Sequence, residues 1–305
     1  MTDAPQMTYA PRRPAHSRFV TVRGLRYHLR SWGGPNAAGA PPIVMLHGWM
    51  DVSASFQFIV DALQAPRCVV APDWRGFGLT ERGPGDCYWF PDYLADLDFL
   101  LDEIAPEQPV VLVGHSMGGN VALLYAGSRP QRVRAVVNLE GFGLKDSPPA
   151  RAPQRYAEWM DELKRPPAGR DYASLDEVAA RLRRTNPRLP PEKAAFLAPH
   201  WSWPQPGGGL RVAGDPAHRI VNPVLYRWAE VRACWTRVLA PVLWIEGADT
   251  DAYKWAGDAE TVALRRALLP DVRCAVIADA GHMLHHDQPQ ATARVIEEFL
   301  REIKA

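Results

Sequence analysis

The stretch that most constrains this chain is residues 110–119, which read VVLVGHSMGG. It opens with four apolar residues, as in a strand buried on both faces, and residues 120–128 are typical of a helix. Between the two the backbone must reverse sharply, and a side chain at Gly114 or Gly118 would collide with a neighbouring strand or helix. A strand, a tight turn and a helix with a serine at the apex form a nucleophile elbow. The pattern therefore predicts Ser116 as a nucleophile, the alternative being a structural turn that happens to hold a serine.

A second turn of interest follows the apolar segment 43–46 and reads His47-Gly48-Trp49. A glycine after a buried strand lets the backbone turn, so that the N–H of Trp49 can face the sheet edge from which Ser116 emerges. Together with the N–H of Met117 it would form an oxyanion hole, which stabilises the charge of a tetrahedral intermediate. The alternative for this turn, taken alone, is an ordinary strand-to-loop connection.

Composition describes a globular protein and limits the partners it can have. The chain has 305 residues, enough for one large α/β domain with an insertion or for two small domains. Its 47% hydrophobic and 23% charged residues are typical of soluble globular proteins. A net charge of +1 offers no electrostatic attraction to nucleic acid or anionic membranes. We therefore expect neither a nucleic-acid nor a membrane partner, and the oligomeric state stays open.

The cysteines and the N-terminus indicate the compartment. Cys68, Cys87, Cys234 and Cys274 are widely spaced and form no Cys-x-x-Cys pair, which argues against a zinc site or a disulfide framework. Residues 1–17 contain prolines and arginines but no apolar core, so they indicate a disordered leader and not a signal peptide. We expect a reduced, cytoplasmic protein.

The order of expected elements predicts the fold class. Apolar segments typical of buried strands alternate with amphipathic helical segments, which predicts an α/β fold with a mostly parallel, doubly wound sheet. Between residues 145 and 235 the strand pattern disappears, prolines increase and five tryptophans occur. We interpret residues 145–235 as a helical cap inserted into a core formed by residues 18–144 and 236–305.

A candidate general base lies near the end of the chain. His282 follows the last expected strand and precedes the last helix, and parallel strands bring such a loop to the sheet edge where Ser116 emerges. Gly281 before it gives the side chain freedom to reach the serine hydroxyl. The other eight histidines lack this combination, so His282 is the predicted base.

The carboxylate that would orient this histidine has three candidates. In such a fold the acid usually follows the strand after the cap, three residues beyond a glycine, but that position holds Thr250. Asp249 and Asp251 lie on either side of it. Glu140, at the end of the strand before the cap, can also reach the far nitrogen of the histidine. The choice among Asp249, Glu140 and Asp251 stays open at this point.

Taken together, these motifs resemble the α/β-hydrolase superfamily from about residue 19 onward. The resemblance rests on HGW at 47–49, DWRGFG at 73–78, GHSMG at 114–118, GAD at 247–249 and GH at 281–282. Within the superfamily, HGWMDVSASF at 47–56 and RRTNP at 183–187 resemble the serine hydrolase-like proteins. Haloalkane dehalogenases and epoxide hydrolases share the fold but use an aspartate nucleophile, so Ser116 argues against both. Some dehalogenases place their acid at the position matched by Glu140.

The resemblance and the residues imply a serine hydrolase of the carboxylesterase type. It would cleave an ester-like acyl bond of a small, largely apolar substrate through an acyl-enzyme intermediate, with no metal and no organic cofactor. The alternatives are a lactone, thioester or carbon–carbon bond hydrolase. A further alternative is a catalytically weak small-molecule receptor that keeps the hydrolase fold.

Overall fold

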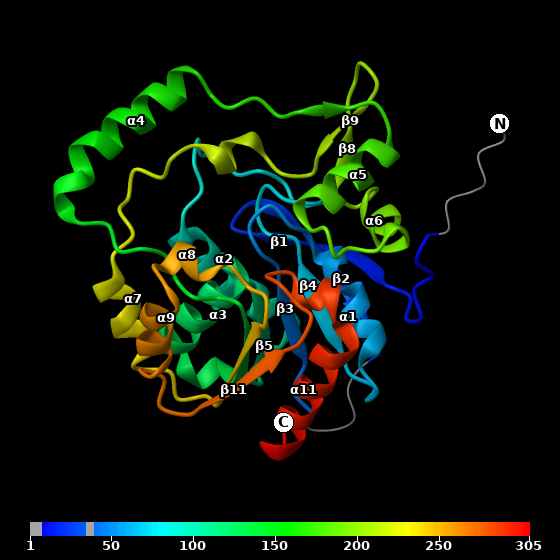
Figure 1. The fold of residues 1–305 in the computed structure, drawn as a ribbon, viewed down its shortest axis with the longest axis vertical. Coiled ribbons are helices and arrows are strands. Elements are labelled where there is room, and N and C mark those ends of the chain that lie inside the picture. The colour runs from blue at the N-terminus through cyan, green and yellow to red at the C-terminus, as the bar shows by residue number, and fades with distance from the viewer. Residues whose placement is uncertain (1–7, 35–39) are drawn as a thin grey trace.

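An eight-stranded sheet forms the centre of the molecule (Figure 1). The computed structural model describes residues 8–34 and 40–305. The strand order is β1-β2-β4-β3-β5-β6-β10-β11, and all pairs from β4 to β11 are parallel, whereas β2 runs antiparallel to both β1 and β4. The predicted α/β class with a mostly parallel sheet is therefore confirmed. The strands are β1 (His16–Val22), β2 (Leu25–Trp32), β3 (Ile43–Leu46), β4 (Val69–Pro72), β5 (Val110–His115), β6 (Val133–Leu139), β10 (Val242–Gly247) and β11 (Val272–Ile277).

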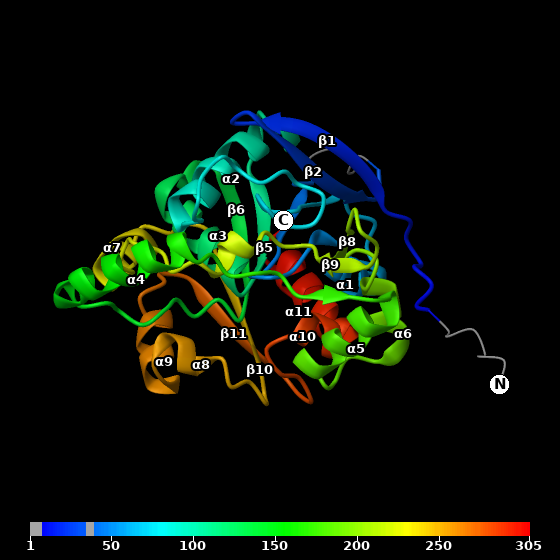
Figure 2. The same cartoon turned by 90° about the horizontal axis from the view of Figure 1, so that it is seen from above.

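Helices cover both faces of the sheet, and each face has its own apolar core. Figure 2 shows α2, α3 and α7 on one side of the strands and α1 and α11 on the other. Strand β5 contributes to both cores, because successive side chains of a strand point to opposite faces: Val110 and Leu112 belong to one core, Val111 and Val113 to the other. The helices are α1 (Gln57–Ala62), α2 (Phe90–Ile104), α3 (Met117–Ser128), α7 (Trp228–Trp235), α8 (Tyr253–Ala256), α9 (Ala259–Arg266), α10 (Leu284–Asp287) and α11 (Pro289–Glu302).

The segment between β6 and β10 contains more than the expected helices. Besides α4 (Ala152–Lys164), α5 (Leu175–Thr185) and α6 (Pro191–Leu197), it forms a three-stranded sheet of β7 (Asp171–Tyr172), β9 (Leu210–Val212) and β8 (Ser202–Pro204). Residues 205–209 connect β8 to β9, and Gly208 and Gly209 there adopt positive φ, the conformation that glycine supplies in tight turns. Such short strands carry too little alternation to be recognised from sequence.

The last helix of this segment belongs to the core of the fold. Val231 and Trp235 of α7 are buried in the same core as α3. The two helices approach so closely that a Cβ at Gly127 would lie 2.0 Å from the carbonyl oxygen of Cys234. The core therefore resumes at α7, before the expected boundary at residue 236. In contrast, α4 has no buried residue and stands away from the body of the molecule (Figure 1).

The described part of the predicted disordered leader is packed against the core. The Tyr9 hydroxyl donates a hydrogen bond of 2.8 Å to Asp61, and its ring contacts Phe58 and Phe196 edge-on. Strand β1 already begins at His16. Composition alone did not indicate this packing, because Tyr9 contacts residues 49 or more positions away in the sequence. Residues 1–7, which also belong to the predicted leader, lie outside the described residues.

None of the helices described is both long and apolar enough to cross a bilayer.

The burial of His218 makes the stability of the protein depend on pH. His218 stacks between Phe77 and Tyr88, with ring centroids 3.7 and 3.6 Å away, and burial lowers its pKa to about 3. Below about pH 6.5 this imidazole is therefore protonated in the unfolded chain but stays neutral in the native chain. The free energy of unfolding consequently decreases as pH falls from 6.5 toward 3.

We expect His218→Phe, which keeps an aromatic ring between the two neighbours, to remove this contribution. Urea unfolding at pH 7 and pH 5 should show that the wild type loses about 2 kcal/mol more than the variant over this interval. His16→Phe, at an exposed position of β1, is the control and should retain the wild-type difference. An equal loss in His218→Phe and wild type would contradict the assignment.

Candidate active site

Ser116 occupies the sharp turn that the sequence predicts. It lies between the end of β5 and the start of α3, with φ 52° and ψ −114°, a backbone conformation that costs energy for any residue except glycine. A Cβ at Gly114 would lie 2.3 Å from the carbonyl oxygen of Gly118, and one at Gly118 would lie 2.0 Å from that of Leu46. The turn can therefore form only with glycine at both positions.

His282 reaches the same cavity as Ser116 from the other end of the chain. It follows β11 and precedes α10, and both residues line a cavity of about 530 Å³. The backbone carbonyl of His282 accepts a hydrogen bond of 2.9 Å from Nε2 of His115, the residue before the serine. The ring of Trp255 packs edge-on against the imidazole, at 4.6 Å between centroids. The first contact holds the histidine loop against the elbow and the second holds the imidazole against α8, and the sequence revealed neither.

Glu140 is the candidate carboxylate that contacts the imidazole. Its Oε2 lies 3.2 Å from Nδ1 of His282, and its side chain is fully buried. Two further groups hold this carboxylate: the backbone N–H of Gly247 donates to Oε1 at 2.7 Å, and the Thr250 hydroxyl donates to Oε2 at 2.5 Å. Thr250, which occupies the position where the sequence pattern placed the carboxylate, thus donates a hydrogen bond to Glu140, which follows the neighbouring strand β6.

The other two candidates have different partners. Asp249 pairs with Arg188 at 2.9 Å, and about half of its side chain is exposed. Asp251 pairs with Lys254 on the surface, three residues along the chain. Of the predicted site residues, the structure therefore brings together Ser116, His282 and Glu140, and it places Asp249 in an exposed ion pair.

The turn after β3 packs directly on the elbow. A Cβ at Gly48 would lie 2.9 Å from Nδ1 of His115 and 3.3 Å from Cβ of Ser116. Burial lowers the pKa of His47 to about 4, and Nε2 of its neutral ring accepts a hydrogen bond from the backbone N–H of Trp74 at 2.9 Å. Its Nδ1 can then donate to the carbonyl of Gly48 at 2.8 Å, which fixes the turn. Trp49 and Met117 consequently line the same cavity as Ser116.

The cavity is mainly apolar and lies between the sheet edge and the inserted segment. The core contributes Phe142 and Leu144, and the insertion contributes Leu182, Leu189 and Trp201. A second cavity of about 380 Å³ adjoins it, and the two share Trp49, Phe90, Met117 and Leu144 as lining residues.

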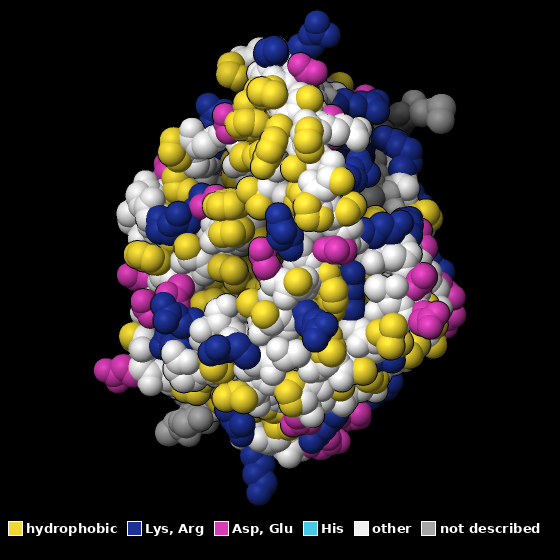
Figure 3. Space-filling view, turned by 90° about the vertical axis from the view of Figure 1, so that its left-hand side faces the viewer, with side chains coloured by type: hydrophobic (Ala, Val, Ile, Leu, Met, Phe, Trp, Pro, Cys, Tyr) yellow, Lys and Arg dark blue, Asp and Glu magenta, His cyan; other side chains and the backbone are white. Residues whose placement is uncertain are grey.

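Figure 3 shows the side that carries α4 and α7, where apolar side chains gather in a band over the upper part of the face.

A further group of buried polar side chains borders the first cavity. Asp51 and His286 line it, and His285 lies beside them. Burial raises the pKa of Asp51 to about 7 and lowers that of His286 to about 3 and that of His285 well below its usual value. Both imidazoles are therefore neutral at pH 7. In the sequence, neither histidine shares the features that mark His282.

Comparisons with known proteins agree with the fold described above. The family model for the alpha/beta hydrolase fold matches residues 41–289. The chain is 25% identical to a serine hydrolase-like protein of Danio rerio, over 85% of this chain and 81% of that protein. It is 26% identical to the 2-(acetamidomethylene)succinate hydrolase of Mesorhizobium japonicum, over 93% and 95%. The thioesterase domain from the curacin biosynthetic pathway superposes with a TM-score of 0.83 at 24% identity, covering 93% of this chain and 99% of that domain.

The elbow geometry predicts a strong effect of a single methyl group. We expect Gly118→Ala to lower the free energy of unfolding by about 3 kcal/mol or more, because the new Cβ would overlap the backbone of β3. Urea unfolding measures this change. Gly207→Ala is the matched control, since no atom lies within 4 Å of a Cβ there, and it should change stability by less than about 0.5 kcal/mol. Equal stabilities of the two variants would refute the close approach.

Proposed function

Because the chain belongs to the alpha/beta hydrolase fold family, we propose that it is a serine hydrolase that cleaves an ester-like acyl bond. The observation that carries this proposal is the contact between the buried carboxylate of Glu140 and the imidazole of His282, which line one cavity with Ser116. A nucleophile, a base and an orienting acid, here after β5, β11 and β6 at one edge of the sheet, are the parts that acyl transfer needs.

In this proposal the reaction runs through an acyl-enzyme. The Ser116 hydroxyl gives its proton to Nε2 of His282 as Oγ attacks the carbonyl carbon, and Glu140 accepts a hydrogen bond from Nδ1–H and stabilises the imidazolium. The backbone N–H groups of Trp49 and Met117 stabilise the oxyanion. His282 then protonates the leaving group. Water, activated by the same imidazole, attacks the ester carbon and releases the acid and free Ser116.

The cavities support a small substrate with two largely apolar parts. The first cavity holds the reacting residues, and the second meets it at Trp49 and Met117, the two residues assigned to the oxyanion. A carbonyl held between those residues would direct its acyl part into one cavity and its alcohol part into the other. We therefore infer a carboxylic ester with an apolar acyl group as the substrate class.

An activity-based probe tests the nucleophile. A fluorophosphonate should label the wild type covalently at Ser116, because a serine activated by a histidine attacks phosphorus as it attacks a carbonyl. Ser116→Ala should show no labelling, and neither should it hydrolyse p-nitrophenyl acetate or butyrate above background. A folded wild-type protein that ignores both the probe and a panel of p-nitrophenyl esters of rising chain length would favour a binding protein and overturn the proposal.

A pair of isosteric variants tests the acid. Glu140→Gln should lower kcat/KM for the best ester by about 10³–10⁴-fold, since the amide cannot stabilise the imidazolium. Asp249→Asn is the matched control and should stay within about threefold of wild type, because its exposed ion pair contributes little. The reverse order of effects, or similar mild losses in both variants, would show that Glu140 is not the acid.

A further inference from the structure

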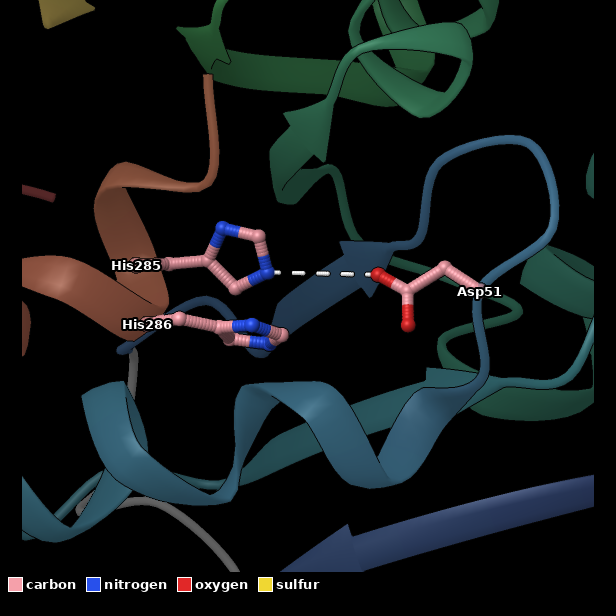
Figure 4. Close-up of side chains that lie close together, drawn as sticks. All are labelled: Asp51, His285 and His286. Atoms are coloured by element: carbon pink, nitrogen blue, oxygen red, sulfur yellow. Dashed lines mark ion pairs between the residues drawn. The ribbon is translucent and has the colours of Figure 1, made fainter. Parts of the chain in front are cut away.

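Three side chains that the proposed reaction does not use point toward one another beside the cavity (Figure 4). Asp51 comes from the loop after β3, and His285 and His286 come from α10. Nε2 of His285 lies 3.9 Å from Oδ2 of Asp51, and one donor atom from each residue lies within 4.8 Å of the others. All three side chains are at most 2% exposed. Two segments separated by more than 230 residues thus direct their polar groups at a common point.

Several donor atoms of this cluster make no hydrogen bond of ordinary geometry. Among the described residues, none makes such a bond to Oδ2 of Asp51 or to either ring nitrogen of His285 and His286, and only weaker interactions join Asp51 to the Trp201 indole and His286 to the Ser55 backbone. The other oxygen of Asp51 is satisfied, because it accepts from the Val52 N–H at 2.7 Å and from the Ser55 hydroxyl. A buried polar atom without a partner costs about 1–3 kcal/mol, so folded proteins rarely leave several of them together.

We propose that Asp51, His285 and His286 bind a divalent transition-metal ion of the Zn²⁺ type. Two imidazole nitrogens and one carboxylate oxygen are the ligands that such ions prefer, whereas Ca²⁺ and Mg²⁺ require mostly oxygen. Ligands about 2.1 Å from a tetrahedral ion lie about 3.4 Å apart, so the three donors need to close by about an ångström around the ion. Asp51 and His286 line the cavity, which leaves the fourth position open to water from that side.

The site would connect the two loops that the proposed reaction depends on. His285 follows the proposed base, His282, by three residues, and Asp51 follows Trp49 by two. The His115 ring contacts both histidines of this loop, with its centroid 4.3 Å from that of His285 and 4.7 Å from that of His282. An ion held by Asp51 and α10 therefore fixes the oxyanion turn relative to the histidine loop. This is a positioning role, and no bond of the substrate is made or broken at the ion.

Metal binding by the full chain tests the proposal without reference to activity. Chelator-treated wild-type protein should bind one Co²⁺ per chain with d–d absorption of a four- or five-coordinate nitrogen and oxygen site, and Zn²⁺ should displace the Co²⁺. At a Zn²⁺ concentration of 100 times Kd, Tm should rise by about 5 °C. Wild-type protein that binds neither ion, or that shows only the spectrum of hydrated Co²⁺, would overturn the proposal outright.

Variants locate the ion. Asp51→Asn, His285→Gln and His286→Gln should each weaken Zn²⁺ binding by about 100-fold or more, while His282→Gln and the exposed-site variant His16→Gln should bind as the wild type does. Loss of binding in His282→Gln alone would place the ion on the proposed base, and unchanged binding in the three cluster variants would mean an adventitious surface ion; either result refutes the site. Cooperative unfolding of each metal-free variant checks its fold. If a histidine variant does not fold, the test of the site is Zn²⁺ binding by Asp51→Asn, which keeps the shape of the side chain, compared with Zn²⁺ binding by the wild type.

Discussion

The positive-φ backbone at Ser116 is the constraint on which the rest of the site depends. It is held by a sheet strand before it, a helix after it, and contacts with β3 too close for any side chain at Gly118. Because the strain is local and the support comes from three elements of the core, the serine position is fixed by the same packing that holds the sheet together. The turn after β3, to which we assign the oxyanion in our proposal, is fixed in the same way, since Gly48 packs on His115 and Ser116.

The carboxylate that contacts His282 follows one strand and is held by a residue that follows the next strand of the sheet. Strands β6 and β10 are paired, with Leu139 opposite Ile245, so their carboxyl ends lie side by side. Strand β10 in turn pairs with β11, which precedes the His282 loop. In this chain the glutamate comes from β6, and Thr250 after β10 donates a hydrogen bond to it. The hydroxyl keeps the buried carboxylate satisfied, which a second carboxylate at that position would not do.

The segment between β6 and β10 forms part of the cavity that Ser116, Glu140 and His282 line. Its α5 and the loop after it supply one wall of the larger cavity, and an apolar cluster shared with Val52, Ala54 and Phe58 of the core holds them in place. Helix α4 has no buried residue and contributes none to this cavity, whereas α5 and α6 are anchored in an apolar cluster, so the two halves of the insertion differ in how firmly they are packed. Within one fold family, such an insertion changes substrate range without changing the reacting residues.

The sequence by itself predicted the features that depend on residues close together in the chain. The strand, turn and helix around Ser116, the alternation of strands and helices, and the position of His282 after the last strand all follow from local patterns and from the rule that parallel strands end at one edge. Tertiary structure alone decided which carboxylate meets His282, that α7 belongs to the core, and that Asp51 meets His285 and His286. Each of these is a contact between segments about 100 or more residues apart, and its geometry depends on packing distances of a few ångströms that no local pattern encodes.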